Sequence, residues 1–136
     1  PIPGSKVNWP AAGTPGTVGW HELIAKDWEQ VWPFYEKLFG WKKTTAMDMG
    51  AMGTYQIFSA GGPDIGAMMT KPKENPAPMP YWNYYIFVAS VTAAAEKIKI
   101  GGGQVLMGPM EVPGGQYIVQ ALDPPGALFC LVSAGK

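Results

Sequence analysis

The fold of this 136-residue chain can be worked out from the stretch GWHELIAKD at 19–27, which has a counterpart in WNYYIFVAS at 82–90. Further along, GTYQIF at 53–58 matches GQYIVQ at 115–120. The offset of roughly 63 residues indicates two copies of one supersecondary unit, each with an apolar face that it cannot bury alone. We therefore expect the two copies to pack together around a shared cleft, where the function resides.

Each copy is predicted to run strand, helix, strand, strand, strand. Residues 17–25 are apolar enough for a buried strand, and Asp27 is a good N-cap for the helix that follows. Gly40 is a natural C-cap for that helix. The remaining strands and the second helix are predicted at 41–47, 53–59 and 64–69 in the first copy and at 81–89, 92–100 (helix), 104–107, 115–122 and 127–133 in the second.

The predicted boundaries follow the proline and glycine content. Residues 1–16 hold four prolines and three glycines and are interpreted as an extended N-terminal arm. A first βαβββ unit at 17–70 and a second at 81–134 are joined by a Pro-rich linker at 71–80. The two units are expected to form one compact α+β domain.

Charge and composition exclude several classes of partner. The formal net charge is +0 and there is no basic run, so we expect no nucleic-acid partner. All ten basic residues are lysine, which argues against a site that clamps a carboxylate or phosphate with two parallel hydrogen bonds. No apolar run is long enough to span a bilayer, so we expect no membrane partner.

Cysteine usage and the N-terminal sequence favour a cytoplasmic location. Cys130 is the single cysteine, which rules out an intrachain disulfide and a zinc site built from several cysteines. The N-terminal sequence lacks a charged region followed by an apolar one, the pattern of a secretory signal.

Two motifs carry a resemblance to a known family. Asp27 followed by FYEKLFGW at 34–41, and LDPPGAL at 122–128, are similar to the vicinal oxygen chelate superfamily, which includes glyoxalase I, bleomycin-resistance proteins and extradiol dioxygenases. The resemblance covers roughly residues 17–133 and is strongest to glyoxalase-related proteins of unassigned activity. It implies the glyoxalase/bleomycin resistance fold, in which two tandem βαβββ units form an incomplete eight-stranded barrel-like sheet.

The resemblance also implies four positions where family members hold a divalent metal. Carried over to this sequence, these positions are Trp20 and Asn83 in the first strands and Met68 and Cys130 in the last strands. Hard cations prefer carboxylate, imidazole or carbonyl ligands, so these four side chains do not make such a site. A shift of one residue would bring in His21 alone, and it would reverse the face of the strand. We therefore expect no metal and no other cofactor.

Without a metal, the cleft is expected to bind a small apolar or aromatic molecule. Alternation along a strand places Trp20 and Glu22 on one face. The other predicted ligand-binding residues are Tyr55, Met68, Asn83, Tyr85, Tyr117 and Cys130. A lining of this kind suits a flat or amphipathic ligand oriented by few polar groups.

Glu22 and Cys130 have two interpretations each. Burial among aromatic side chains would raise the pKa of Glu22 and suit it to acid–base catalysis. Alternatively, Glu22 accepts a hydrogen bond from a tyrosine hydroxyl or a backbone amide and has a structural role. Cys130 is a candidate nucleophile, but cysteines in apolar strands usually serve packing.

Three functional hypotheses remain open on the sequence. The first is a metal-free module that binds a small molecule. The second is a glyoxalase-like lyase or isomerase, or another enzyme of the superfamily, that uses Glu22 as acid–base or a divalent metal at an unplaced site. The third is an interaction domain that pairs with a second chain. Both units lie in one chain, so either a monomer or a homodimer is expected.

Overall fold

The computed structural model describes residue 4 and residues 8–136. Residues 1–3 and 5–7 of the predicted arm lie outside the described residues, and 8–16 contain turns but no helix or strand. Contacts divide the chain into two units. One comprises Trp20–Tyr85, and the other comprises Ile86–Lys136 together with the segment that ends at Gly19. We call them the Trp20–Tyr85 unit and the C-terminal unit.

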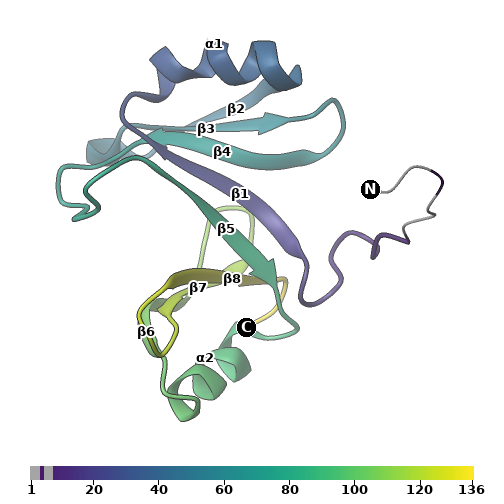
Figure 1. Ribbon diagram of the computed structural model, residues 1–136, viewed down its shortest axis with the longest axis vertical. Coiled ribbons are helices and arrows are strands. Elements are labelled where there is room, and N and C mark those ends of the chain that lie inside the picture. Colours follow the sequence, from purple (N-terminus) through teal and green to yellow (C-terminus); the bar gives the residue numbers. More distant parts are fainter. Residues whose placement is uncertain (1–3, 5–7) are drawn as a thin grey trace. The chain divides into compact units, whose positions relative to one another are not determined.

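The Trp20–Tyr85 unit is a five-stranded sheet with a helix against one face (Figure 1). Its strand order is β2-β3-β4-β1-β5. Strand β1 runs parallel to β4, whereas β2, β3 and β4 pair antiparallel in sequence order. The elements are β1 (Val18–Ala25), α1 (Trp28–Phe39), β2 (Lys42–Asp48), a short 3-10 helix η1 (Gly50–Met52), β3 (Thr54–Ser59), β4 (Asp64–Thr70) and β5 (Tyr81–Phe87).

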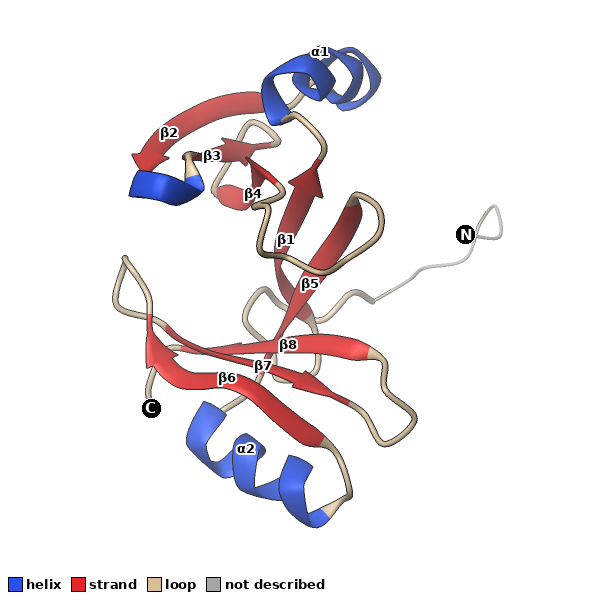
Figure 2. Ribbon diagram, turned by 90° about the vertical axis from the view of Figure 1, so that its left-hand side faces the viewer, coloured by secondary structure: helices blue, strands red, loops and turns tan. Residues whose placement is uncertain are grey.

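The C-terminal unit repeats the arrangement with one helix and three antiparallel strands in the order β8-β7-β6 (Figure 2). Helix α2 packs through Val91 and Ala95 against Val119 and Ala121 of β7 and Leu131 of β8. The elements are α2 (Val91–Ile100), β6 (Gln104–Glu111), β7 (Tyr117–Leu122) and β8 (Leu128–Ser133).

Helix α1 begins and ends where the sequence predicts. The Asp27 side chain accepts hydrogen bonds from the backbone N–H groups of Glu29 (3.1 Å) and Gln30 (3.4 Å), which otherwise have no partner in the first turn. Gly40 ends the helix with φ 68°, a left-handed conformation that a side chain disfavours. Pro33 lies inside the helix, which continues through it to Phe39.

Each unit has its own hydrophobic core. In the Trp20–Tyr85 unit, Trp28 and Trp32 of α1 pack on Leu23, Phe58 and Met68 of the sheet. Lys43 lies near both tryptophans, with Nζ 5.3 Å and 5.5 Å from the centres of the Trp28 and Trp32 rings. Tryptophan side chains contribute large apolar areas, so helix α1 is held mainly by its buried face.

The described residues form eight strands and two α-helices, which confirms the predicted α+β class and the βαβββ order of both copies. The longest departure is β6, which runs to Glu111, whereas the prediction ended at 107. Gly108 and Pro109 are residue types that usually occur in turns. The structure instead includes both residues in a strand with shifts in register. The exact limits of the arm, the linker and the units stay a prediction.

A substitution at Gly66 tests how closely the backbones of β1 and β4 approach each other. A Cβ atom at Gly66 would collide with the backbone carbonyl oxygen of His21, its partner in the parallel ladder. We expect Gly66→Ala to lower the free energy of unfolding by roughly 3 kcal/mol, because the backbone cannot move aside as a side chain can. Urea unfolding measures the loss.

The control for this experiment is Gly62→Ala, where an added Cβ would meet nothing within 4 Å. Its unfolding curve is expected to match that of the unsubstituted chain. Equal curves for both variants would contradict the close approach of β1 and β4.

Candidate functional site

Strand β1 separates two environments, because its side chains alternate between the faces of the sheet. Leu23 and Ala25 point into the core beneath α1. His21 shares their face, and its Nδ1 lies 2.9 Å from the carbonyl oxygen of Ile65. Trp20 and Glu22 therefore project from the opposite face. This agrees with the expectation that Trp20 and Glu22 share one face of the strand.

A chain of hydrogen bonds joins three side chains on this second face. The Trp20 indole Nε1–H donates to the Tyr55 hydroxyl oxygen at 2.9 Å. The Tyr55 hydroxyl donates in turn to Glu22 Oε2 at 2.6 Å. Asn83 of β5 also hydrogen-bonds the Glu22 side chain. The predicted residues Trp20, Glu22, Tyr55 and Asn83 thus form one connected cluster, which we call the Glu22 cluster.

Burial shapes the chemistry of the cluster. Glu22 is only 9% exposed, and this desolvation raises the pKa of its carboxyl above the ordinary value, although the hydrogen bonds from Tyr55 and Asn83 act in the opposite direction. Burial also raises the pKa of Tyr55, and the nearby Glu22 charge adds to the effect. Tyr55 therefore stays a neutral donor, and Glu22 holds a proton more readily than an exposed glutamate.

Two further side chains border the cluster. Tyr85, 5% exposed, lies close enough to Tyr55 to raise its pKa. Met47 lies directly opposite Tyr55 in the β2–β3 ladder, so both side chains are on the same face. The sequence placed Met47 only in a Met-rich segment beside a Gly-rich loop. Its partner becomes visible only once the strand register is known.

The structure shifts one predicted position by one residue. Met68 pairs with Leu23 and Gln56, and it lies fully buried in the helix-side core. Ala67 is the residue beside Glu22 on the cluster's face. A slip of one residue moves a side chain to the other face of a strand, so Met68 is not part of the Glu22 cluster.

The repeat explains the slip. Phe58 and Met68 of the first core correspond to Ala121 and Leu131 of the second core, 63 positions later in both cases. The same offset pairs Ala67 with Cys130. The predicted positions Met68 and Cys130 are 62 residues apart, because Cys130 was placed by its distance from the DPPG motif at 123–126.

Tyr117 and Cys130 belong to the C-terminal unit. Tyr117 packs against the core beneath α2. Cys130 is fully buried in β8, where it pairs with Gln120 of β7. Full burial in an apolar strand fits the packing interpretation of Cys130 better than the nucleophile interpretation. Ligand contacts by Tyr117 and Cys130 stay a prediction.

An aromatic cluster covers the other face of the Trp20–Tyr85 unit. The Tyr35 ring stacks with Trp41 at 5.7 Å between centroids, and the Trp82 ring meets it edge-on at 5.4 Å. The Trp82 indole N–H donates to the Tyr35 hydroxyl oxygen at 3.2 Å. Trp41 continues the stack onto Phe58 at 4.4 Å. These contacts tie together α1, β3, β5 and Trp41, the residue before β2, and they lie on the opposite side of the sheet from the Glu22 cluster.

The residues at the family's metal positions do not fit a divalent cation. Trp20 already donates its N–H to Tyr55, and its indole offers no lone pair for coordination. Ala67 occupies the place on this face where Met68 was predicted, and its side chain has no atom that could coordinate a metal. Among residue 4 and residues 8–136, no group of three or more His, Cys, Asp or Glu side chains could hold a metal ion.

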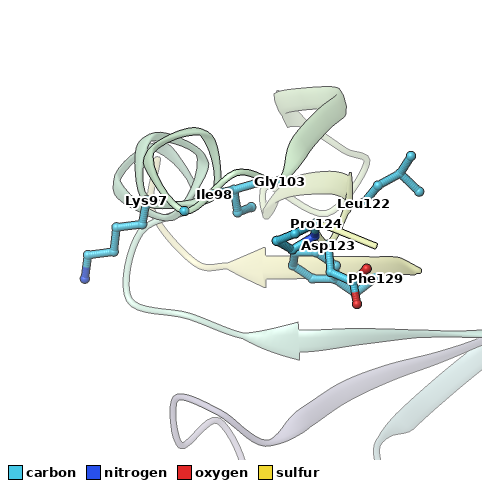
Figure 3. Close-up of a pocket in the computed structure, with 8 residues that line it drawn as sticks. Lys97, Ile98, Gly103, Leu122, Asp123, Pro124 and Phe129 are labelled. Carbon is cyan, nitrogen blue, oxygen red and sulfur yellow. The ribbon is translucent and has the colours of Figure 1, made fainter. Parts of the chain in front are cut away.

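The C-terminal unit carries a pocket of about 160 Å³ at the end of α2 (Figure 3). Ile98, Leu122, Pro124 and Phe129 give it a largely apolar wall. Figure 3 shows the Lys97 side chain extending away from Phe129. The Asp123 carboxylate accepts from the backbone N–H groups of the adjacent turn. No predicted site residue lines this pocket.

Comparison with known proteins identifies relatives over most of the chain. The family model for the Glyoxalase/Bleomycin resistance protein/Dioxygenase superfamily matches residues 17–131. Anthracycline biosynthesis protein DnrV of Streptomyces peucetius is 31% identical over 89% of this chain and 48% of its own length. A putative glyoxylase of Mycobacterium tuberculosis is 33% identical over 89% of this chain and 47% of its own length. The chain thus spans about half the length of these relatives.

Solved structures confirm the predicted fold. Methylmalonyl-CoA epimerase from Mycobacterium tuberculosis superposes with a TM-score of 0.68 at 12% identity, over 93% of this chain and 92% of that one. A Streptomyces coelicolor methylmalonyl-CoA epimerase variant in complex with 2-nitronate-propionyl-CoA gives 0.68 at 17% identity, over 89% and 99%. At such identities the likeness establishes the fold and no activity.

Neither α-helix in the described part of the chain is long and apolar enough to cross a membrane. A cytoplasmic location stays a prediction.

The raised pKa of Glu22 has a consequence for stability. The folded state binds the Glu22 proton more tightly than the unfolded chain, so the free energy of unfolding falls as pH rises from about 4.5 through the folded pKa. We expect Glu22→Gln to lack this fall, because the amide does not titrate. Urea unfolding of both chains from about pH 4 to about pH 8 measures the difference between their free energies of unfolding.

Glu96→Gln on the exposed surface of α2 is the control. A constant difference between Glu22→Gln and the unsubstituted chain would show that Glu22 titrates normally.

The side chains at the family's metal positions lead us to expect that the chain binds no divalent metal. Elemental analysis of the freshly purified chain is expected to find no stoichiometric divalent metal. Added Mn²⁺ or Ni²⁺ is expected to leave the thermal midpoint unchanged, because an ion that binds only the folded state would raise it. A stoichiometric metal, or a midpoint that rises with metal concentration, would contradict the expectation.

Proposed function

This chain belongs to the glyoxalase/bleomycin resistance protein/dioxygenase superfamily, and we propose that its Trp20–Tyr85 unit binds a small planar aromatic molecule on the face of the Glu22 cluster. The observation that carries the proposal is the hydrogen-bond chain from Trp20 through Tyr55 to Glu22. It holds two aromatic rings in fixed positions, and it leaves their ring surfaces as the principal contact area.

Glu22 is the residue that orients the rings. Its carboxyl accepts a hydrogen bond from Tyr55 and is hydrogen-bonded to Asn83, so it is held in place by side chains from two other strands. Tyr55 is likewise committed, because it donates to Glu22 and accepts from Trp20. Side chains already engaged in this way recognise a ligand through stacking and shape.

The names of two relatives suggest which planar aromatic molecules to test as ligands. The Streptomyces relatives are called anthracycline biosynthesis proteins. An anthracycline is a flat polycyclic quinone, and such a surface stacks well on indole and phenol rings. Met47 beside Tyr55 adds a flexible and polarisable contact that adapts to the outline of a ring system. We therefore propose anthracycline-like polycyclic aromatics as the first ligands to test.

A second candidate function is acid–base catalysis by Glu22, in a glyoxalase-like lyase or isomerase. The raised pKa of Glu22 favours it, since a carboxyl that holds its proton more readily than an exposed glutamate can act as a general acid. The hydrogen bonds from Tyr55 and Asn83 oppose it, because they hold the carboxyl oxygens inside the protein.

Binding is tested by titrating the chain into daunorubicin and following the fluorescence of the quinone chromophore. We expect saturable binding that Trp20→Ala weakens by about tenfold, equivalent to about 1.4 kcal/mol, because one stacking surface is lost. Trp9→Ala is the matched control, because Trp9 is 81% exposed and lies outside the cluster. Equal affinity of both variants would contradict a site on this face.

The same titration separates the two candidate functions. Gln at position 22 still accepts a hydrogen bond from Tyr55 through its carbonyl oxygen, so Glu22→Gln is expected to keep the affinity within about threefold. Tyr84→Phe, on the other face of β5, is a control for changes in tyrosine content. Conversion of the ligand by the unsubstituted chain but not by Glu22→Gln would instead establish the catalytic role.

A further inference from the structure

The pocket at the end of α2 belongs to the C-terminal unit and has no part in the Glu22 cluster (Figure 3). Gly101 and Gly103 line it where α2 ends, and neither has a side chain that would fill the space. A Cβ atom at Gly103 would lie 2.7 Å from the carbonyl oxygen of Leu122 and 2.8 Å from Ile98 Cγ2, so a side chain does not fit there without a shift. The pocket therefore depends on the glycines that follow the helix.

A second wall of the pocket is fixed by the Asp123 side chain, which holds its own turn closed. Asp123 Oδ1 accepts hydrogen bonds from the backbone N–H groups of Gly126 at 2.9 Å and Ala127 at 2.6 Å. Backbone bonds of 2.9 Å link the same residues, from the Gly126 N–H to the Asp123 carbonyl oxygen and from the Asp123 N–H to that of Ala127. These bonds keep the turn, and so the wall, in one shape.

The volume and the apolar side chains of the pocket set the size of a ligand. The volume is about 160 Å³, and Ile98, Leu122, Pro124 and Phe129 supply most of the side chains that line it. An apolar cavity of about 150 Å³ accommodates one benzene molecule. The pocket therefore fits one small ring or a compact branched group, and it is too small to enclose a polycyclic ligand.

The charged groups around the pocket favour a cation. Of the eight residues that line it, Asp123 is acidic and Lys97 is basic. Figure 3 shows the Lys97 side chain extending away from Phe129, and Lys99 in the same turn of α2 is ion-paired with Glu96 at 3.3 Å. Both lysines are thus directed elsewhere, and the Asp123 carboxylate is the charge that a ligand in the pocket meets.

Two further features of the pocket also favour positive charge. The end of α2 borders it through Lys97, Ile98 and the C-cap residue Gly101, and the carboxyl end of a helix carries a partial negative charge. Phe129 supplies an aromatic ring, and the face of such a ring attracts an ammonium ion. A carboxylate, a helix carboxyl end and an aromatic ring around one apolar space suit an organic ammonium ion.

We propose that this pocket binds a small organic ammonium ion whose apolar body is no larger than one ring. Both backbone N–H groups that bond the Asp123 side chain donate to Oδ1, so Oδ2 is the oxygen expected to accept from the ammonium group. The apolar body packs on Ile98, Pro124 and Phe129. The ligand differs in charge and size from the one proposed for the Glu22 cluster, so this site does not depend on that proposal.

Benzylammonium is the probe, because it joins one ring to one ammonium group. Titration into the isotope-labelled chain, followed by NMR, is expected to shift the Gly101 and Gly103 amide signals to saturation. The expected dissociation constant is about 1 mM, which is typical of a ligand with so few atoms. Benzyl alcohol and benzoate keep the ring but carry no charge or a negative one, and each is expected to bind at least about tenfold more weakly.

Removal of the carboxylate charge tests the role of Asp123. Asp123→Asn keeps a side-chain oxygen for the two backbone N–H groups, and it is expected to raise the benzylammonium dissociation constant by about tenfold. The matched control is Glu111→Gln, the same change at the other end of β6, because Gln104 pairs with Leu122 at the pocket whereas Glu111 pairs with Tyr117. This control is expected to keep the dissociation constant within about twofold.

A second variant changes the charge of the pocket without altering the turn. Lys97→Glu places another carboxylate at the edge of the pocket, so it is expected to lower the benzylammonium dissociation constant by about threefold. NMR signals from the rest of the chain show whether each variant folds. The result for Lys97→Glu stands even where Asp123→Asn fails to fold.

Four results would overturn the proposal. The first is a lack of saturable shifts at Gly101 and Gly103 up to about 20 mM benzylammonium. The second is binding of benzyl alcohol or benzoate that is as tight as that of benzylammonium. The third is an equal dissociation constant for folded Asp123→Asn and Glu111→Gln. The fourth is a dissociation constant that Lys97→Glu leaves unchanged or raises.

Discussion

The hydrogen bond from the Tyr55 hydroxyl to the Glu22 carboxyl, 2.6 Å long, is the constraint on which the Trp20–Tyr85 unit depends. A carboxyl buried in a sheet is costly unless donors satisfy it. Tyr55 lies on β3 and Glu22 on β1, with β4 between them in the sheet. The bond therefore spans three strands, and a slip of either outer strand by one residue would break it.

The two faces of this sheet differ in the kind of contact that they make. On the helix side, Trp28 and Trp32 bury apolar surface, and Tyr35, Trp41 and Trp82 extend the packing to the end of α1. On the other side, the polar atoms of Trp20, Tyr55 and Glu22 are directed at one another. The buried apolar surface of the unit thus lies mostly on the helix side, and the polar contacts lie on the other side.

Much of the fold and part of the candidate site could be predicted from the sequence, and the wrong or missing predictions have one cause. Asp27 and Gly40 mark the limits of α1 because capping and left-handed backbone conformation are local properties. Trp20 and Glu22 were predicted to share a face, because alternation along a strand is also local. Met68 was misplaced, and Met47 was not linked to Tyr55, because both depend on the register between strands. Register is decided by turns whose residue counts the motifs do not settle.

The sequence by itself determined the α+β class and the two βαβββ copies, and its motifs indicated the family. Those conclusions rest on periodicity and on residue types, which do not change on folding. Only the tertiary structure decided that Glu22 is held by Tyr55 and Asn83, that Ala67 stands where Met68 was expected, and that Phe34 and Leu38 face solvent. Such pairings join residues far apart in the chain, so they are set by packing and register across the whole sheet.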